Sequence, residues 1–219
     1  MHMNNDFRIF LVGDSTMKTY DNTEAPQTGW GQFIKDYFTK DVPIFNYALG
    51  GRSTRTFMEE GHLDKVFGEI KESDYLFVQM GHNDSSKNKP ERYTEPNTTY
   101  KKNLKIYIKG TIERNAKPIL ITPVARLKYK NEQFITDLTE YCIAMKEVAQ
   151  EESIPLIDLN TKSLHYYSSL GYEEAMKLFM VSVKGSDYTH FTELGGVEIA
   201  RLVAEGIKEL NIDLSRYIK

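Results

Sequence analysis

Short apolar runs recur along the chain, separated by polar and glycine-rich segments. The first of them, residues 7–12, reads Phe-Arg-Ile-Phe-Leu-Val and ends at Gly13. Runs of this length, rich in β-branched and aromatic side chains, are typical of buried strands in a parallel sheet. The pattern predicts five strands, at residues 7–12, 43–48, 74–80, 117–121 and 154–159.

A different spacing marks the segments between these runs. Five apolar residues between positions 30 and 38 recur at helical spacing after Thr28, which predicts a helix capped by that threonine. Similar stripes predict helices over residues 97–115, 136–152 and 192–210. Alternating strands and helices indicate a doubly wound parallel sheet with helices on both faces. The predicted fold is α/β, a three-layer α/β/α sandwich around a five-stranded parallel sheet.

The bulk properties limit domains and partners. A chain of 219 residues fits one domain, expected over residues 7–219 after an N-terminal tail at 1–6. The net charge is −3 and its basic residues are dispersed, so no nucleic-acid partner is expected. No apolar run reaches the roughly 20 residues that span a bilayer, so no membrane partner is expected. Nothing indicates an oligomeric state.

The start of the sequence and its one cysteine bear on location and metals. Residues 1–6 carry neither a basic segment nor an apolar run of signal-peptide type, which favours the cytoplasm, with a leader removed beforehand as the alternative. Cys142 rules out an internal disulfide and a cysteine-rich metal site, and a buried thiol is expected. No histidine pair has metal-ligand spacing and no phosphate-binding glycine motif is present, so neither metal nor cofactor is predicted.

Four polar segments hold the residue types that acyl transfer requires. They are Gly-Asp-Ser-Thr at 13–16, Gly-Gly-Arg-Ser at 50–53, Gly-His-Asn-Asp at 81–84 and Asp-Tyr-Thr-His at 187–190. The first three follow predicted strand ends, where sites form in parallel α/β sheets. The fourth must return to that edge for its residues to meet the others.

Ser15 is the candidate nucleophile, because it follows a strand and a glycine in a tight turn. Taken alone, a Gly-Asp-Ser-Thr motif is better explained by Ser15 or Thr16 capping the following segment, and it is the other three segments that favour a nucleophile. The Gly-x-Ser-x-Gly elbow of α/β-hydrolases is absent. His190 is the candidate base, since Asp187 lies three residues before it and a turn brings that carboxylate to Nδ1 while Nε2 faces the serine. Asp187 then fixes the tautomer and stabilises the imidazolium.

Three donors are candidates for an oxyanion hole. The Asn83 side chain offers an N–H, Gly51 offers a backbone N–H without a Cβ beside it, and the Ser15 amide is the third. Each segment has an alternative explanation, a positive-φ turn at the glycines and an Asx turn at Asn83.

Other polar residues of these segments leave alternatives open. Arg52 and Arg55 either bind a substrate carboxylate or tie backbone carbonyls or a neighbouring acid such as Asp14 or Asp84. His82 either contacts substrate or shapes its loop, and its neighbours favour the second role. Trp30 is expected in the core rather than as a sugar platform, because it lies on an apolar stripe.

The order of these motifs resembles the SGNH hydrolases, also called the GDSL esterase/lipase superfamily. Within it, Gly13–Thr16, Thr28–Gly31, Asn46–Phe57, Gly81–Asp84 and Asp187–Phe191 are similar to the rhamnogalacturonan acetylesterase branch, and Gly-Gly-Arg-Ser-Thr-Arg-Thr-Phe is the most specific stretch. The resemblance spans the first strand to the last helix. It implies a flavodoxin-like SGNH fold, Ser15 as nucleophile, Gly51 and Asn83 as oxyanion donors, Asp187 as orienter and His190 as base.

The resemblance also implies an activity, a serine esterase that removes O-acetyl groups from carbohydrate through an acetyl-serine intermediate. The expected partner is an acetylated oligosaccharide derived from pectin. A lipid or thioester hydrolase of the same superfamily is the second hypothesis, and a catalytically idle carbohydrate-binding protein is the third. Segments 85–97 and 123–135 match no motif, and the polar composition of the first favours sugar esters over lipids.

Overall fold

A five-stranded parallel sheet forms the centre of the molecule, as the sequence predicted. The structure is a computed structural model that describes residues 7–39 and 41–219, so the predicted tail at residues 1–6 lies outside the described residues. The strands are arranged in the order β2-β1-β3-β4-β7. Their bounds are β1 Ile9–Gly13, β2 Ile44–Asn46, β3 Tyr75–Gln79, β4 Lys117–Ile121 and β7 Leu156–Ile157.

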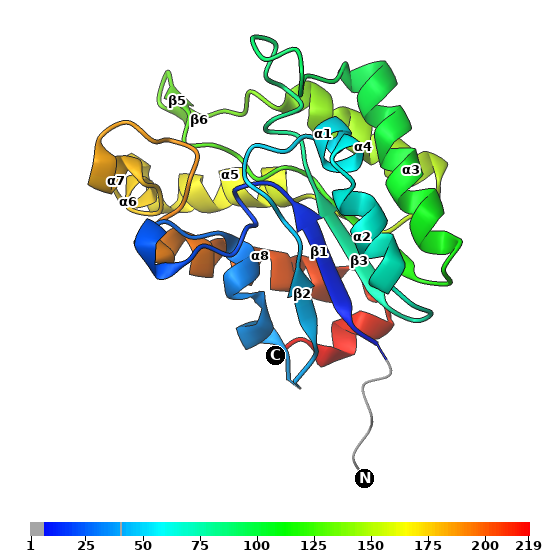
Figure 1. Ribbon diagram of the computed structural model, residues 1–219. Coiled ribbons are helices and arrows are strands. Elements are labelled where there is room, and N and C mark those ends of the chain that lie inside the picture. Colours follow the sequence, from blue (N-terminus) through cyan, green and yellow to red (C-terminus); the bar gives the residue numbers. More distant parts are fainter. Residues whose placement is uncertain (1–6, 40) are drawn as a thin grey trace.

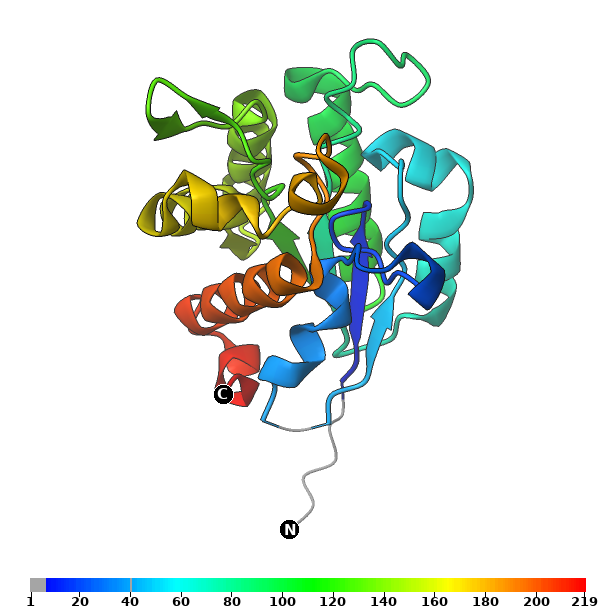
Figure 2. The same ribbon diagram turned by 90° about the vertical axis from the view of Figure 1, so that its left-hand side faces the viewer.

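Helices cover both faces of this sheet, which gives the three predicted layers (Figure 1). In β1, Phe10 and Val12 face a core cluster shared with the helices on one side, whereas Ile9 and Leu11 face a second cluster on the other. The first side carries α1 Thr54–Glu59, α2 His62–Glu69, α3 Lys101–Ile112 and α4 Thr139–Glu151. The second carries α5 Leu159–Leu170 and α8 Glu193–Glu209, which lie to the left of the sheet in Figure 2.

The shorter elements lie in the connections. These are the helices α6 Tyr172–Met176 and α7 Val181–Lys184, the 3₁₀ helices η1 Asn22–Glu24, η2 Trp30–Gln32, η3 Ile34–Tyr37 and η5 Asp213–Tyr217, and a π-helical turn, η4 Pro96–Tyr100. A two-stranded hairpin, β5 Tyr129–Lys130 and β6 Gln133–Phe134, projects beyond the carboxyl edge of the sheet (Figure 1). Among the described residues, no helix is both long enough and apolar enough to cross a membrane.

The single helix predicted after Thr28 is wrong, since two short 3₁₀ helices, η2 and η3, occupy the segment. Gly29 is the N-cap, and Thr28 instead forms a bridge with Phe191. The amide of Trp30 donates to the carbonyl of Thr16 at 3.0 Å, and a Cβ on Gly29 would lie 2.2 Å from the Lys18 carbonyl oxygen. Close packing against the loop after β1 therefore replaces regular helix geometry.

Several helices escaped prediction because they are short or start inside an apolar run. The helices α1 and α2 have six and eight residues and are separated at Gly61, whose φ is +79°. The fifth strand is shorter than predicted, because Asp158 caps α5 by accepting from the Thr161 amide. The predicted helix at 192–210 is confirmed as α8, capped by Thr192. Cys142 is buried, as expected.

Trp30 is fully buried, as predicted, and its Nε1 donates to Gln79 Oε1 at 3.0 Å. We expect Trp30→Ala to lower the free energy of unfolding by about 3–5 kcal/mol, because it opens a large cavity and leaves the amide oxygen without its donor. Urea unfolding followed by circular dichroism measures the change. Ile106→Ala, at an exposed position of α3, is the control and should stay within about 0.5 kcal/mol of the parent. An equal loss in both variants would contradict this account.

Candidate active site

The four polar segments meet at the carboxyl edge of the sheet. Parallel pairing of β1 with β2 and β3 brings three of the loops together, because all three strands end at this edge. The segment containing His190 is held there by backbone bonds, from Thr28 N to Phe191 O at 3.0 Å and from Met180 N to His190 O at 2.8 Å. The expected return of the fourth segment is therefore observed.

Ser15, His190 and Asp187 lie in hydrogen-bond contact. His190 Nε2 is 2.9 Å from Ser15 Oγ, and His190 Nδ1 is 2.9 Å from Asp187 Oδ2. A carboxylate accepts only, so Nδ1 carries the hydrogen and Nε2 presents its lone pair to the hydroxyl. The side chains of His190 and Asp187 are 28% and 21% exposed, which leaves this row of groups accessible from solvent.

The carboxylate of Asp187 is held by the backbone as well as by the imidazole. Its Oδ1 accepts from the amides of Thr189 and His190 at 3.1 and 3.0 Å. Partial burial would raise the pKa of Asp187, but the hydrogen bonds and positive charge from His190 outweigh it and hold that pKa below its usual value. Asp187 therefore remains ionised at neutral pH, as an acceptor for Nδ1 must be.

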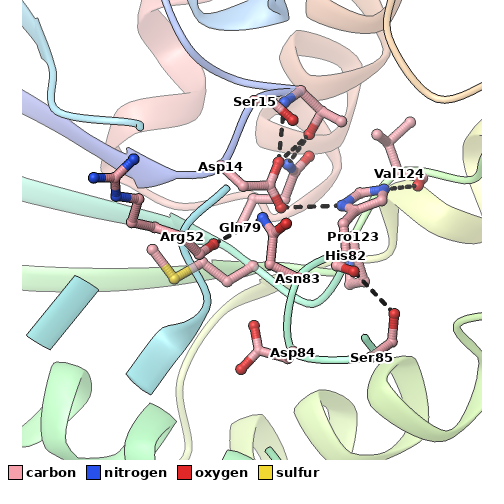
Figure 3. Close-up of polar contacts among 12 residues, drawn as sticks. Asp14, Ser15, Arg52, Gln79, His82, Asn83, Asp84, Ser85, Pro123 and Val124 are labelled. Carbon is pink, nitrogen blue, oxygen red and sulfur yellow. Dashed lines mark hydrogen bonds and ion pairs between the residues drawn. The ribbon is translucent and has the colours of Figure 1, made fainter. Parts of the chain in front are cut away.

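The candidate oxyanion donors lie on adjoining loops. A Cβ on Gly50 would lie 3.7 Å from the Ser15 Cβ, so the loop after β2 passes directly beside the serine. Gly51 has a φ of +79°, the left-handed conformation that glycine adopts readily. Asn83 donates one hydrogen of its Nδ2 to the carbonyl of Arg52 at 2.9 Å, which fixes the side chain and leaves the second hydrogen available (Figure 3).

Within the part of the chain that the structure describes, the backbone amides of Ser15 and Gly51 donate to no acceptor. Together with the second hydrogen of Asn83 Nδ2, three N–H donors are left without a partner beside the serine hydroxyl. Gly51 is exposed and Ser15 is partly exposed, so their N–H groups are open to solvent and a ligand oxygen can replace water there. The arrangement therefore suits an anion that develops next to Ser15 Oγ.

A buried carboxylate braces the turn that carries Ser15. Asp14 is fully buried, and its Oδ1 accepts from the amide and the hydroxyl of Thr16 at 2.9 and 2.8 Å. Its Oδ2 lies 3.1 Å from His82 Nδ1 (Figure 3). Burial opposes ionisation of Asp14, but the neighbouring imidazole and the Thr16 donors prevail, so its pKa lies below the usual value.

His82 has no free ring nitrogen for a substrate. Its Nδ1 faces Asp14, its Nε2 lies 2.9 Å from the carbonyl oxygen of Val124, and only 4% of the residue is exposed. The imidazole thus links the loops after β1, β3 and β4. This position fits the loop-shaping alternative and not substrate contact.

Arg52 and Arg55 are tied within the protein, although not to the acids that the sequence suggested. Arg52 Nε forms an ion pair with Glu60 at 2.9 Å, and its Nη1 donates to the Gly50 carbonyl. Arg55 Nε pairs with Glu59 at 2.9 Å. These contacts favour the structural alternative for both arginines. Arg92, which sequence reasoning missed because its loop matches no motif, lies instead beside the glycine loop, 3.5 Å from the Gly51 carbonyl.

Asp84, which the sequence suggested only as a partner of the arginines, is a second buried carboxylate. Its Oδ1 accepts from the hydroxyl groups of Thr54 and Thr94 at 2.5 and 2.7 Å, and both oxygens accept from the Thr54 amide. Asp84 thereby joins the loop of Asn83 to the start of α1, just beyond Gly51 and Arg52. Complete burial raises its pKa to about 6, although the threonine hydrogen bonds oppose the rise.

Metal-binding side chains are not clustered at the site among the described residues. Over residues 7–39 and 41–219, no three His, Cys, Asp or Glu side chains are grouped so as to hold an ion. The chemistry available from these residues is therefore that of a hydroxyl, an imidazole, a carboxylate and three N–H donors, which is the set needed for acyl transfer.

Comparison with known proteins shows which family and which proteins this chain is similar to. A family model for GDSL-like lipase/acylhydrolase proteins matches residues 9–203. A Bacillus subtilis (strain 168) protein named "Probable rhamnogalacturonan acetylesterase YesY" is 54% identical over 210 residues, which cover 96% of this chain and 96% of YesY. Rhamnogalacturonan acetylesterase RhgT from the same organism is 38% identical over 226 residues, which cover 99% of this chain and 96% of RhgT.

A solved structure shares the fold. The crystal structure of YxiM from Bacillus subtilis matches with a TM-score of 0.83 and 29% identity, covering 94% of this chain and 57% of that one. The family match includes every residue of the candidate site, from Asp14 to His190.

The raised pKa of Asp84 predicts a pH dependence of stability. Because the native state binds this proton more tightly than the unfolded chain, the group's stabilising contribution is complete below about pH 4 and is lost as pH rises through about 6. The gap from 3.8 to about 6 corresponds to about 3 kcal/mol. Unfolding free energies of the parent and Asp84→Asn, measured in urea from pH 4 to 7.5, should therefore change relative to each other by up to this amount, the parent losing more.

Asp64→Asn removes an exposed carboxyl on α2 and serves as the control, with a constant offset from the parent expected across this range. If the unfolding free energies of the parent and Asp84→Asn changed in parallel with pH, Asp84 would have the same pKa in the folded and unfolded states, which would contradict the prediction.

Proposed function

The chain belongs to the GDSL-like lipase/acylhydrolase family, and from that premise we propose that it is a serine esterase that removes O-acetyl groups from rhamnogalacturonan oligosaccharides. The contact that carries the proposal is the 2.9 Å approach of His190 Nε2 to Ser15 Oγ. The substrate class rests on YesY and RhgT, which are named for rhamnogalacturonan acetylesterase activity.

In the first half of the proposed reaction, Ser15 Oγ attacks the acetyl carbonyl carbon while His190 Nε2 takes the hydroxyl proton. The carbonyl oxygen becomes an oxyanion in a tetrahedral intermediate. When that intermediate collapses, the bond to the sugar oxygen breaks, and His190 returns the proton to the leaving oxygen. The products are the free sugar hydroxyl and an acetyl group covalently attached to Ser15.

In the second half, water attacks the acetyl-Ser15 ester and His190 again accepts the proton. The second tetrahedral intermediate expels Ser15 Oγ, which regains its proton from the imidazole, and acetate leaves. Asp187 holds Nδ1–H throughout and stabilises the imidazolium that forms twice per turnover. The lowered pKa of Asp187 supports this role, because the carboxylate keeps its charge while the imidazole accepts and returns the proton.

The oxyanion is assigned to the amides of Ser15 and Gly51 and to the side chain of Asn83. Donors that are already oriented stabilise the developing charge without further reorganisation. The bond from Asn83 to the Arg52 carbonyl and the brace of Asp84 on the next turn support this assignment, since both restrict motion of the donors.

The two alternative functions have less support. A lipid or thioester hydrolase would use the same groups but has no counterpart among the names of the two similar acetylesterases. A carbohydrate-binding protein without catalytic activity would not need the hydrogen-bonded set of Ser15, His190 and Asp187. The cytoplasmic location expected from the sequence stays a prediction, which fractionation of cells expressing a tagged chromosomal copy tests.

Substitution of the proposed nucleophile and base tests the function. With acetylated rhamnogalacturonan oligosaccharides and with p-nitrophenyl acetate, we expect Ser15→Ala and His190→Ala each to lower kcat by about 10⁴-fold or more, because the two groups act as a unit. Acetate release and nitrophenol absorbance are the measurements. Ser169→Ala, at an exposed position of α5, should leave kcat unchanged. Full activity of Ser15→Ala would remove the mechanism, and faster cleavage of long-chain esters than of sugar acetates would favour a lipid hydrolase.

Loss of a single oxyanion donor should affect kcat more than KM. We expect Asn83→Ala to lower kcat by about 10²- to 10³-fold, since the donor acts mainly on the charged intermediate. Asn97→Ala, at an exposed position of η4, is the matched control. A raised KM with unchanged kcat would instead make Asn83 a residue of uniform substrate binding.

A further inference from the structure

A groove lies beside the segment that carries His190. It has a volume of about 560 Å³, and its walls include Tyr129 and Lys130 of the β5–β6 hairpin, Lys128 before it, Tyr172 at the start of α6 and Tyr188. We call this the hairpin groove. Tyr188 lies between Asp187 and His190 in the sequence, so one wall of the groove belongs to the segment that carries the candidate base.

The walls of the hairpin groove are fixed to that site by the backbone. Leu127 N donates to Tyr188 O at 2.9 Å, and Ile135 N donates to Lys128 O at 3.0 Å, which closes the base of the hairpin. The hairpin lies beyond the carboxyl edge of the sheet (Figure 1), the edge at which β1 ends and the loop with Ser15 begins. A substrate with its acetyl group at Ser15 can therefore extend along the groove.

Exposed aromatic rings form one side of the groove. Tyr129 and Tyr188 are 42% and 43% exposed, so both rings present a large part of their surface to a ligand. The Tyr129 ring is 4.9 Å from the Tyr172 ring and 4.8 Å from the Phe134 ring, so it is held in place before any ligand arrives. A rigid tyrosine offers an apolar face and a polar hydroxyl, the combination that suits the C–H face and hydroxyl groups of a sugar.

The charges of the groove are positive in a chain whose net charge is −3. Lys128 shares Asp137 with Arg126, at 2.8 and 2.9 Å, so this group of three keeps one positive charge. Lys130 forms no ion pair with any carboxylate of the described residues. No aspartate or glutamate lines the groove. An anionic ligand is therefore favoured over a neutral one.

We propose that the hairpin groove binds the uronate-bearing sugars that adjoin the acetylated residue of the substrate. This inference rests on the proposed esterase function and extends it from the acetyl group to the rest of the oligosaccharide. Lys130 contacts a uronate carboxylate, and Tyr129 and Tyr188 contact sugar rings. Rhamnogalacturonan contains both a deoxysugar and an acidic sugar, which matches a wall of aromatic rings beside unpaired lysine. An acyl chain has no group that would use Lys130.

Two substrates that differ only in charge test the role of Lys130. One is an acetylated rhamnogalacturonan oligosaccharide, and the other is the same oligosaccharide with its uronate carboxyls reduced to alcohols. We expect the parent enzyme to have a lower KM for the charged substrate, and Lys130→Gln to raise that KM about two- to fivefold, the range for one exposed charge pair. The difference between the two substrates should shrink correspondingly.

Lys102→Gln, on the exposed side of α3, is the matched control because it removes one positive charge from another face. It should keep the preference of the parent for the charged substrate. An equal KM change for both substrates in Lys130→Gln, or no change for either, would overturn the proposal. A selective loss on long-chain esters in Tyr129→Ala would assign the groove to an acyl chain instead.

A binding experiment separates failure of the groove from failure of the esterase function. In the Ser15→Ala background, titration calorimetry with the deacetylated charged oligosaccharide measures binding without turnover. We expect Lys130→Gln to weaken this binding by the same two- to fivefold factor. If the parent releases no acetate yet binding depends on Lys130, the function fails and the groove stands. If acetate is released but binding ignores Lys130, the groove assignment fails alone.

Discussion

The buried carboxylate of Asp14 is the group on which the geometry of the site depends. A charge in a dry interior costs several kcal/mol unless it is paired and hydrogen-bonded, so its partners are constrained as strictly as the charge itself. Asp14 holds Thr16 and His82. Thr16 Oγ1 accepts from Gln79 Nε2, and Gln79 Oε1 accepts in turn from Trp30 Nε1. This chain of contacts fixes the turn of Ser15 to the sheet beneath it.

Asp84 braces the loop of Asn83 as Asp14 braces the turn of Ser15, but the pKa values of the two buried carboxyls shift in opposite directions. Asp14 has an imidazole beside it and a lowered pKa, whereas Asp84 has only neutral donors and a raised one. The repulsion between two nearby carboxylates adds to this separation. The turn of Ser15 and the loop of Asn83 are thus held by two carboxylates that are both fully buried.

Much of the fold followed from local patterns. Strands β1, β3 and β4 were predicted within about two residues, because continuous apolar runs between two helical layers leave little choice of structure. The structure of the segment after Thr28 was not predicted, because its backbone contacts the loop after β1. The Trp30 amide donates to the Thr16 carbonyl, and Gly29 packs against the Lys18 carbonyl. Helical spacing cannot report a contact made by a distant carbonyl. Short helices such as α1 were not predicted, because hydrogen bonds at the N-cap define them more than an apolar stripe does.

The sequence by itself determined which groups the site contains, since Ser15, Asn83, Asp187 and His190 are recognisable from residue type, order and position after strand ends. Only the tertiary structure decided how they are held. His82 faces Asp14 and Val124, Asp84 faces two threonines, and Arg52 pairs with Glu60. The hairpin groove likewise joins side chains from three separate segments. The burial of a side chain and its hydrogen-bond partners depend on residues that are distant in the sequence. Tertiary packing brings these residues together, and the local spacing of residues does not encode it.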